Sequence, residues 1–166
     1  MDAYLSIGSN IDPIYYIQAG IADLRQQYGK LNISPVYESE SVGFSGSNFY
    51  NLIVAFETVQ DPYEVNKNLR MIETKHGRQR SGQRFSSRTL DLDLILYDNL
   101  ILKDNGLELP RGEILRYAFV LQPLADLVPD LLHPVTGQSY AELWQQFDKT
   151  EQLLWQVQMD FPTWTS

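Results

Sequence analysis

The sequence predicts an α+β fold of the ferredoxin-like type, a βαββαβ antiparallel sheet with helices on one face and a helical C-terminal extension. Two Asp-Pro pairs, at 12–13 and 61–62, each precede apolar residues at helical spacing. Alternating apolar residues, typical of strands, lie before, between and after these two helices. This order is that of the split βαβ arrangement. A chain of 166 residues is expected to form one domain, residues 1–166.

The first strand and helix have clear boundary signals. Residues 3–7 alternate as a half-buried strand does, and Gly8-Ser9-Asn10 ends the pattern. Asp12 is predicted to be the N-cap of the next helix, because its side chain can accept a hydrogen bond from a free backbone N–H. Pro13 suits the first helical position, and Gly29 ends the helix.

The later elements follow from the same kinds of signal. Residues 31–42 are predicted to form a second strand, irregular after Tyr37, and residues 49–57 a third. Asp61-Pro62 starts the second helix, which is expected to run to about His76. The remaining predicted elements are a strand over 88–97, a short hairpin around 104–106, helices over 117–127 and 140–147, and a segment over 153–159 that fits either a strand or a loose tail.

Composition excludes several kinds of site. The chain has no cysteine, so disulfides and thiolate metal sites are excluded. Its two histidines, His76 and His133, lie far apart, which disfavours a histidine zinc site. No apolar run approaches the ~18 residues of a membrane span, and the N-terminus lacks the basic region of a signal peptide. We therefore expect a cytoplasmic protein with no membrane partner. We also expect a monomer, although composition does not bear on the oligomeric state.

The predicted strand over 88–97 carries Asp91 and Asp93 on one face, while leucines occupy the alternate positions 90, 92, 94 and 96. Residues two apart in a strand point to the same side, about 6.6–6.8 Å apart. Neighbouring carboxylates repel each other unless a cation lies between them. Mg²⁺ is ordinarily held by one or two carboxylates together with substrate phosphates. The pattern indicates a Mg²⁺ site; the alternative is the solvated face of an amphipathic edge strand.

The segment before this strand is basic, although the whole chain has a formal net charge of −8. Guanidinium groups bind phosphate oxygens bidentately and keep their charge. An acidic protein opposes the approach of a nucleic acid, so we expect no nucleic-acid partner and favour a nucleotide-phosphate site. The alternative is an exposed basic loop. The basic residues are Lys75, Arg78, Arg80, Arg84 and Arg88.

Four short motifs recur in a characteristic order along the chain. They are Ile7-Gly8-Ser9-Asn10, Phe49-Tyr50-Asn51, Glu73 with Gly77-Arg78-Gln79-Arg80, and Arg88-Thr-Leu-Asp-Leu-Asp93. Together they resemble one enzyme family, 6-hydroxymethyl-7,8-dihydropterin pyrophosphokinase of folate biosynthesis, over about residues 1–130. The resemblance implies the ferredoxin-like fold and ATP-dependent transfer of a pyrophosphoryl group to the pterin hydroxymethyl, releasing AMP, with two Mg²⁺ ions. The expected partners are thus ATP and a reduced pterin.

The resemblance also implies roles for individual residues. Asp91 and Asp93 would bind both metal ions and, with Arg78 and Arg88, form the catalytic group. Asn51 would hydrogen-bond the pterin, and its ring would lie between two phenylalanines. The implied pterin-binding residues are Ser39, Val42, Gly43, Phe49, Asn51, Phe85 and Phe119. The implied nucleotide-binding residues are Arg70, Glu73, Arg80, Arg84, Leu94 and Arg111.

The chain departs from the family pattern on the nucleotide side. Phe85-Ser86-Ser87 replaces Trp-Gly-Pro, Arg111-Gly112 replaces a histidine and a tyrosine, and Tyr117 stands where the family has an arginine. These changes leave open a divergent paralogue that binds a pterin-like ligand with weak or no transferase activity. A third alternative, an oligomerising or RNA-binding domain, is disfavoured by the acidic composition and by the lack of an RNP-type aromatic strand.

Overall fold

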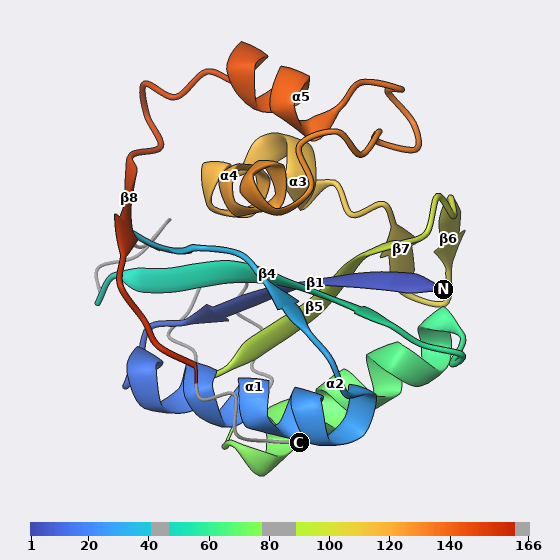
Figure 1. Cartoon of the computed structure of the whole chain (residues 1–166), viewed down its shortest axis with the longest axis vertical. Helices are drawn as coiled ribbons and strands as arrows, with labels where there is room; N and C mark the ends of the chain where they lie inside the picture. The colour runs from blue at the N-terminus through green and yellow to red at the C-terminus, as the bar shows by residue number, and fades with distance from the viewer. Residues whose placement is uncertain (41–46, 78–88, 162–166) are drawn as a thin grey trace.

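A six-stranded antiparallel sheet forms the middle layer of the protein, in the order β5-β1-β4-β3-β8, with β2 also paired to β4 (Figure 1). The computed structural model describes residues 1–40, 47–77 and 89–161. The first four strands in this order give the predicted ferredoxin-like topology, which is confirmed. The strands are β1 Asp2–Ser9, β2 Asn32–Ile33, β3 Val36–Ser39, β4 Phe49–Glu57, β5 Asp91–Tyr97 and β8 Leu154–Val157.

Helices cover both faces of this sheet (Figure 1). Helices α1 (Pro13–Tyr28) and α2 (Pro62–Lys75) lie on one face, as the ferredoxin-like prediction requires. The helices of the predicted C-terminal extension are α3 Glu113–Arg116, α4 Ala118–Leu127 and α5 Tyr140–Gln146, preceded by a hairpin of β6 Leu102–Asp104 and β7 Leu107–Leu109. This extension is not an appendage, because α4 packs on the opposite face of the sheet as a third layer and α5 packs on α4.

Each face of the sheet has its own apolar core, because successive residues of a strand point to opposite sides. On β1, Leu5 and Ile7 pack beneath α1 and α2, whereas Tyr4 packs beneath α4. On β4, Leu52 and Ile53 divide in the same way. Burial on both faces explains why β4 is nearly continuously apolar.

An irregular register between β1 and β5 changes one sequence prediction. Tyr4 pairs with Leu96 but Leu5 pairs with Leu94, so Ile95 is an extra residue on β5. Such a bulge reverses the faces of the residues beyond it. Three of the four leucines, at 90, 92 and 94, lie in the core under α1 and α2, whereas Leu96 lies in the core under α4. The prediction that all four share one face is therefore wrong at Leu96.

The two predicted helix caps behave differently. Asp61 accepts a hydrogen bond from Glu64 N at 2.9 Å, and the Glu64 side chain accepts one in return from Asp61 N, which is a capping box. Asp12 stands at the N-cap of α1 with φ 42°, and its side chain makes no capping bond within the described residues. Asp12 is therefore an N-cap by position only.

The ambiguous segment over 153–159 contains a strand. β8 pairs antiparallel with β3, and Trp155 Nε1 donates to Glu38 Oε1 at 3.2 Å. In the described part of the chain, every helix is too short or too polar to cross a lipid bilayer.

Candidate functional site

One row of residues crosses four strands of the sheet. Tyr37 of β3 lies opposite Asn51 of β4, Asn51 opposite Gly8 of β1, and Gly8 opposite Asp91 of β5. Directly paired residues point to the same face, and adjacent strands are about 4.8 Å apart, which places Asn51 and Asp91 roughly 10 Å apart. The Tyr37 hydroxyl donates to Asp126 of α4, so the row faces the α4 side.

Two further pairs flank the first row on the same face. Ser39 pairs with Phe49 on one side of that row, and Asp93 pairs with Ser6 on the other side. Since residues two apart share a face, the structure brings Ser39, Phe49 and Asn51 to the side of the sheet that carries the two aspartates. Ser39 and Asn51 are buried, so their polar atoms do not belong to the general protein surface.

Gly8 is a site residue whose role the sequence prediction missed. It lies between Asn51 and Asp91 in the row, and its lack of a side chain leaves room for the Asn51 amide oxygen. The motif around Gly8 was visible in the sequence, but the need for glycine depends on the residue opposite. That partner is set by strand register across 43 positions, from 8 to 51.

The N-terminus of α4 brings Phe119 to this face of the sheet. Phe119 stacks on Tyr117 with ring centroids 5.1 Å apart and planes inclined by 14°. The Arg116 guanidinium lies over the Tyr117 ring, 5.9 Å from its centroid. One face of the Phe119 ring is thus covered by Tyr117, so a flat ligand could stack only on its other face.

Asp93 lies among charges of both signs. Burial, together with the neighbouring Asp91 carboxylate, raises the pKa of Asp93 to about 6. Arg111 and Arg70 oppose that rise, and Arg70 Nη2 lies 3.5 Å from Asp93 Oδ1. Two carboxylates that disfavour each other's charge form a place where a cation gains binding energy.

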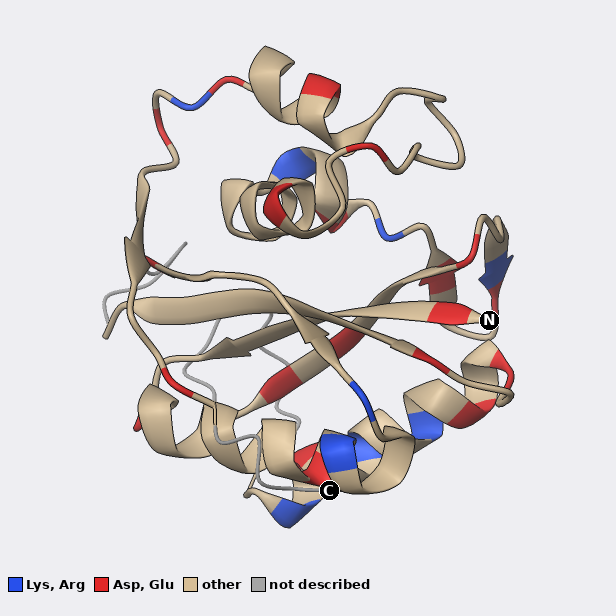
Figure 2. Ribbon diagram, viewed as in Figure 1, with Lys and Arg blue, Asp and Glu red and all other residues tan. Residues whose placement is uncertain are grey.

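Three carboxylates converge at the outer edge of β5. One oxygen from each of Glu73, Asp91 and Asp93 lies within 4.8 Å of the others, and within the described residues this is the sole group of three or more acidic or histidine side chains so placed. Figure 2 shows the two acidic positions along β5. Hard oxygen ligands suit Mg²⁺. Glu73 is fully buried, however, and accepts the Leu92 N–H at 2.7 Å, so it faces the backbone of β5.

Arg111 is the cation that approaches the aspartates from the α4 side. Its backbone N–H donates to Ile95 O at 3.0 Å, which holds the start of α3 against β5. Its guanidinium pairs with Glu113, and its charge acts on Asp93. Arg116 instead folds back on its own turn, donating to Gly112 O at 3.4 Å. Of the two arginines on this side, Arg111 is therefore the one placed for an anionic ligand.

The remaining predicted site residues divide into two groups. Leu94 is 1% exposed in the core under α1 and α2, so the structure does not bring its side chain to the charged groups. The others lie outside the described residues, and their roles stay predictions. They are Val42, Gly43, Arg78, Arg80, Arg84, Phe85 and Arg88.

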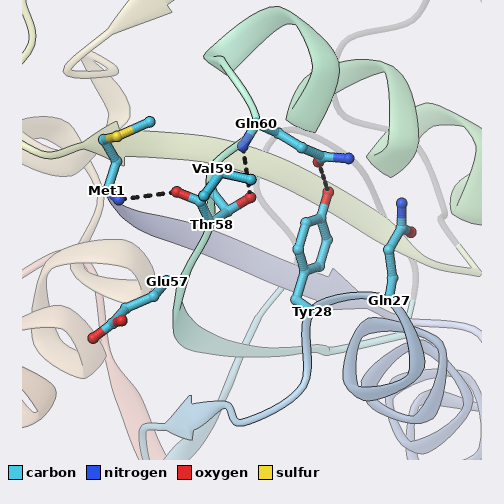
Figure 3. A pocket seen from close by; sticks show the side chains of 7 residues that line it. All are labelled: Met1, Gln27, Tyr28, Glu57, Thr58, Val59 and Gln60. Atoms are coloured by element: carbon cyan, nitrogen blue, oxygen red, sulfur yellow. Dashed lines mark hydrogen bonds between the residues drawn. The ribbon is translucent and has the colours of Figure 1, made fainter.

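A separate cavity of about 420 Å³ lies at the opposite end of β1 (Figure 3). The Met1 amine donates to Thr58 O at 2.9 Å, and the Tyr28 hydroxyl donates to Gln60 Oε1 at 2.8 Å. These four polar groups of its wall thus bind one another in pairs. The cavity lacks the convergent carboxylates and arginines found at β5, so we place the functional site at β5.

Comparison with known proteins points to one family. A family model described as 7,8-dihydro-6-hydroxymethylpterin-pyrophosphokinase (HPPK) matches residues 4–129. A 2-amino-4-hydroxy-6-hydroxymethyldihydropteridine pyrophosphokinase of Haemophilus influenzae is 32% identical over 149 residues, which cover 87% of this chain and 92% of that protein. The match therefore includes all the described site residues.

Some relatives are much longer proteins. The folic acid synthesis protein fol1 of Schizosaccharomyces pombe is 35% identical over 144 residues, covering 84% of this chain but 20% of that protein. The chain thus spans about a fifth of the length of this relative and of its Pneumocystis carinii counterpart.

Solved structures show the same fold. The wild-type HPPK-DHPS of Plasmodium falciparum with pteroate superposes with a TM-score of 0.69 at 15% identity, covering 87% of this chain and 42% of that one. At this identity the likeness establishes the α+β architecture and not the chemistry.

Proposed function

This chain belongs to the 7,8-dihydro-6-hydroxymethylpterin-pyrophosphokinase family, and on that premise we propose that it transfers a pyrophosphoryl group from ATP to the hydroxymethyl group of 6-hydroxymethyl-7,8-dihydropterin. The single observation that supports this most is the row from Asn51 through Gly8 to Asp91. It puts a buried amide and a pair of carboxylates on one face, roughly 10 Å apart, which is about the span of a flat bicyclic ligand with its reactive arm.

In the proposed reaction the pterin hydroxyl oxygen forms a bond to the β-phosphorus of ATP. The bond from that phosphorus to the α,β-bridging oxygen breaks, AMP leaves with the bridging oxygen, and the hydroxyl loses its proton. The protein supplies little covalent chemistry in such a transfer, so positioning and charge compensation carry the catalysis.

Asn51 and the two phenylalanines would position the pterin. The buried Asn51 amide offers a donor and an acceptor to the polar edge of the heterocycle. The face of Phe119 that Tyr117 does not cover and the ring of Phe49 would stack on it. Ser39, buried beside Phe49, would add a hydroxyl to the same wall.

Asp91 and Asp93 would hold Mg²⁺, for which their oxygen set is suited. When bound, such ions neutralise charge on the phosphates and orient the attacking and leaving oxygens. Arg111 and Arg70 lie near the two aspartates from opposite faces of the sheet and would compensate further phosphate charge. The predicted arginines at 78, 80, 84 and 88 would act on the same phosphates.

The proposal is tested by following the products with phosphorus NMR. The protein with ATP, Mg²⁺ and the reduced pterin should form AMP and a pterin diphosphate ester in equal amounts. Formation of inorganic pyrophosphate instead of the ester would contradict the proposed acceptor. Pterin binding without any AMP would favour the alternative of a divergent pterin-binding paralogue.

A further inference from the structure

The outer edge of β5 is occupied by side chains of α2. Within the described residues no strand pairs with that edge of β5. In an antiparallel pair, alternate residues direct both their N–H and their C=O away from the neighbouring strand. Leu92 is such a residue: its N–H donates to Glu73 Oε2 at 2.7 Å, and its C=O accepts from Arg70 Nη1 at 3.1 Å. Two side chains of α2 thus take the place of a neighbouring strand.

Glu73 and Arg70 are also held to each other. Arg70 Nη1 lies 2.9 Å from Glu73 Oε1, and the two residues are one helical turn apart. Glu73 is fully buried, and a buried carboxylate is stable only when it is paired and hydrogen-bonded. The geometry of this pair is therefore fixed by α2 and not by solvent.

Leu92 is the residue between the two aspartates. Its N–H belongs to the peptide plane shared with Asp91, and its C=O belongs to the plane shared with Asp93. Holding both groups fixes both planes, and with them the direction in which each carboxylate leaves the strand. Without these bonds, an unpaired edge strand could twist so that the two like charges move apart.

We propose that Glu73 and Arg70 are positioning residues, a clamp on the Leu92 peptide groups that sets Asp91 and Asp93 at the separation required to bind metal. The inference rests on the proposed function, in which these aspartates hold Mg²⁺. It gives Glu73 a role different from the predicted contact with the nucleotide. It also explains why a carboxylate within 4.8 Å of the aspartates is fully buried.

The test compares Glu73→Gln with Glu73→Ala in the full chain. Both variants lose the same charge, but glutamine keeps an oxygen that can accept the Leu92 N–H. Metal affinity is measured with Mn²⁺ by electron paramagnetic resonance, in the presence of α,β-methylene-ATP. In this analogue a methylene replaces the α,β-bridging oxygen. The bond from the β-phosphorus to that oxygen, which the transfer must break, is therefore missing, and no turnover occurs.

We expect Glu73→Ala to weaken Mn²⁺ binding roughly 10- to 100-fold, the range typical of residues that orient metal ligands, and Glu73→Gln clearly less. Hydrogen exchange of the Leu92 amide should become fast in the alanine variant and stay slow in the glutamine variant. Affinity for the analogue without metal should not change, because Glu73 does not contact it.

Asp61→Ala is the matched control. It removes the cap at the other end of α2 and leaves the contacts of Glu73 and Arg70 with Leu92 in place, so it should lower the melting temperature and leave Mn²⁺ affinity unchanged. If Glu73→Ala does not fold, Arg70→Lys replaces it. Lysine keeps a positive charge but has one nitrogen, so it cannot replace both Arg70 Nη1, which contacts Leu92 O and Glu73, and Nη2, which lies beside Asp93. Mn²⁺ binding should again weaken.

Equal Mn²⁺ affinity in the two Glu73 variants would overturn the clamp. A loss of Mn²⁺ affinity in Asp61→Ala as large as that in Glu73→Ala would also overturn it. If the Glu73 variants bind α,β-methylene-ATP more weakly in the absence of metal, the original prediction that Glu73 contacts the nucleotide would be supported instead. A wild-type protein that binds no Mn²⁺ and releases no AMP would instead contradict the proposed function. If the wild-type protein binds Mn²⁺ and releases AMP, and the Glu73 variants bind Mn²⁺ as the wild type does, the clamp alone is contradicted.

Discussion

A Cβ atom on Gly8 would lie 2.7 Å from Oδ1 of Asn51, the residue directly opposite on β4. This is closer than van der Waals contact, so any side chain at position 8 must displace the Asn51 amide. We expect Gly8→Ala to fold and to bind the reduced pterin ~10-fold more weakly or worse, since overpacking of this kind costs about 1–3 kcal/mol. Calorimetric titration with the pterin measures the loss.

Gly20→Ala is the control for that substitution. Its Cβ would meet the Leu90 side chain at 3.0 Å, on the face of the sheet away from Asn51. It should affect stability but not pterin affinity. An equal loss of pterin affinity in both variants would show that general packing, and not Asn51, is responsible.

The two aspartates should be essential for turnover but not for pterin binding. Asp91→Asn and Asp93→Asn keep the size of each side chain and remove one of two neighbouring charges. We expect each to lower AMP release at least ~100-fold, because metal ions contribute several kcal/mol to such transition states. Asp93→Asn should also raise the melting temperature of the metal-free protein, because burial and the Asp91 carboxylate disfavour the charge of Asp93. Unchanged turnover in both variants would mean that the two aspartates only form the solvated face of an edge strand and have no role in the transfer.

Gln152 should support the pterin site from a distance. Its Oε1 accepts the Ala118 N–H at 2.9 Å and its Nε2 donates to Arg116 O at 2.9 Å, so it caps α4 beside Phe119. Gln152→Ala should destabilise the protein by about 0.5–2 kcal/mol, as the loss of a helix cap does, and weaken pterin binding. Urea unfolding and pterin titration measure the two effects.

Gln152→Glu is the matched variant for this prediction. Glutamate retains an acceptor for the Ala118 N–H but has no donor for Arg116 O, so its stability should lie between those of the wild type and Gln152→Ala. If Gln152→Ala is destabilised but binds pterin normally, the cap serves stability alone.

His133 should make stability depend on pH. Burial lowers the pKa of His133 below its usual 6.5, and Nδ1 accepts the N–H groups of Val135 and Thr136 at 3.1 and 3.2 Å. Because the unfolded chain takes up a proton at higher pH than the folded protein, this contribution to stability is full above pH 6.5. It is lost as the pH falls from there toward the lower folded-state pKa.

The measurement is urea unfolding of the wild type and of His133→Asn at pH 7.5 and pH 5. Asparagine Oδ1 can take the place of Nδ1 as acceptor but does not titrate. The wild type should lose more stability than the variant between the two pH values. Parallel losses in both proteins would mean that other groups cause the dependence.

Local signals were sufficient where the determinants of an element are close in sequence. β4 was predicted with its observed bounds, because nine apolar-rich residues lie between clear loop signals. α2 was predicted from Asp61-Pro62 and from apolar residues at helical spacing, and the structure adds Glu64 as the second half of a capping box. The two carboxylates were predicted on one face because a period of two places them there regardless of their neighbours.

The missed features depend on partners far along the chain. The bulge at Ile95 follows from the pairing of β5 with β1. It alone places Leu96 in the core under α4. The place of β8 depends on β3, more than 110 residues earlier. The contacts of Glu73 with Leu92 and of Gln152 with Ala118 are likewise long-range, and neither residue type at its position signals them.

The central claim is that this chain uses its carboxylate pair to transfer pyrophosphoryl groups to a reduced pterin. The most direct test is AMP release from ATP by the purified protein, with the pterin and Mg²⁺ omitted in turn. We expect AMP only when both are present. A protein that binds the pterin by calorimetry yet releases no AMP in the complete mixture, or that releases AMP equally without the pterin, would contradict the claim.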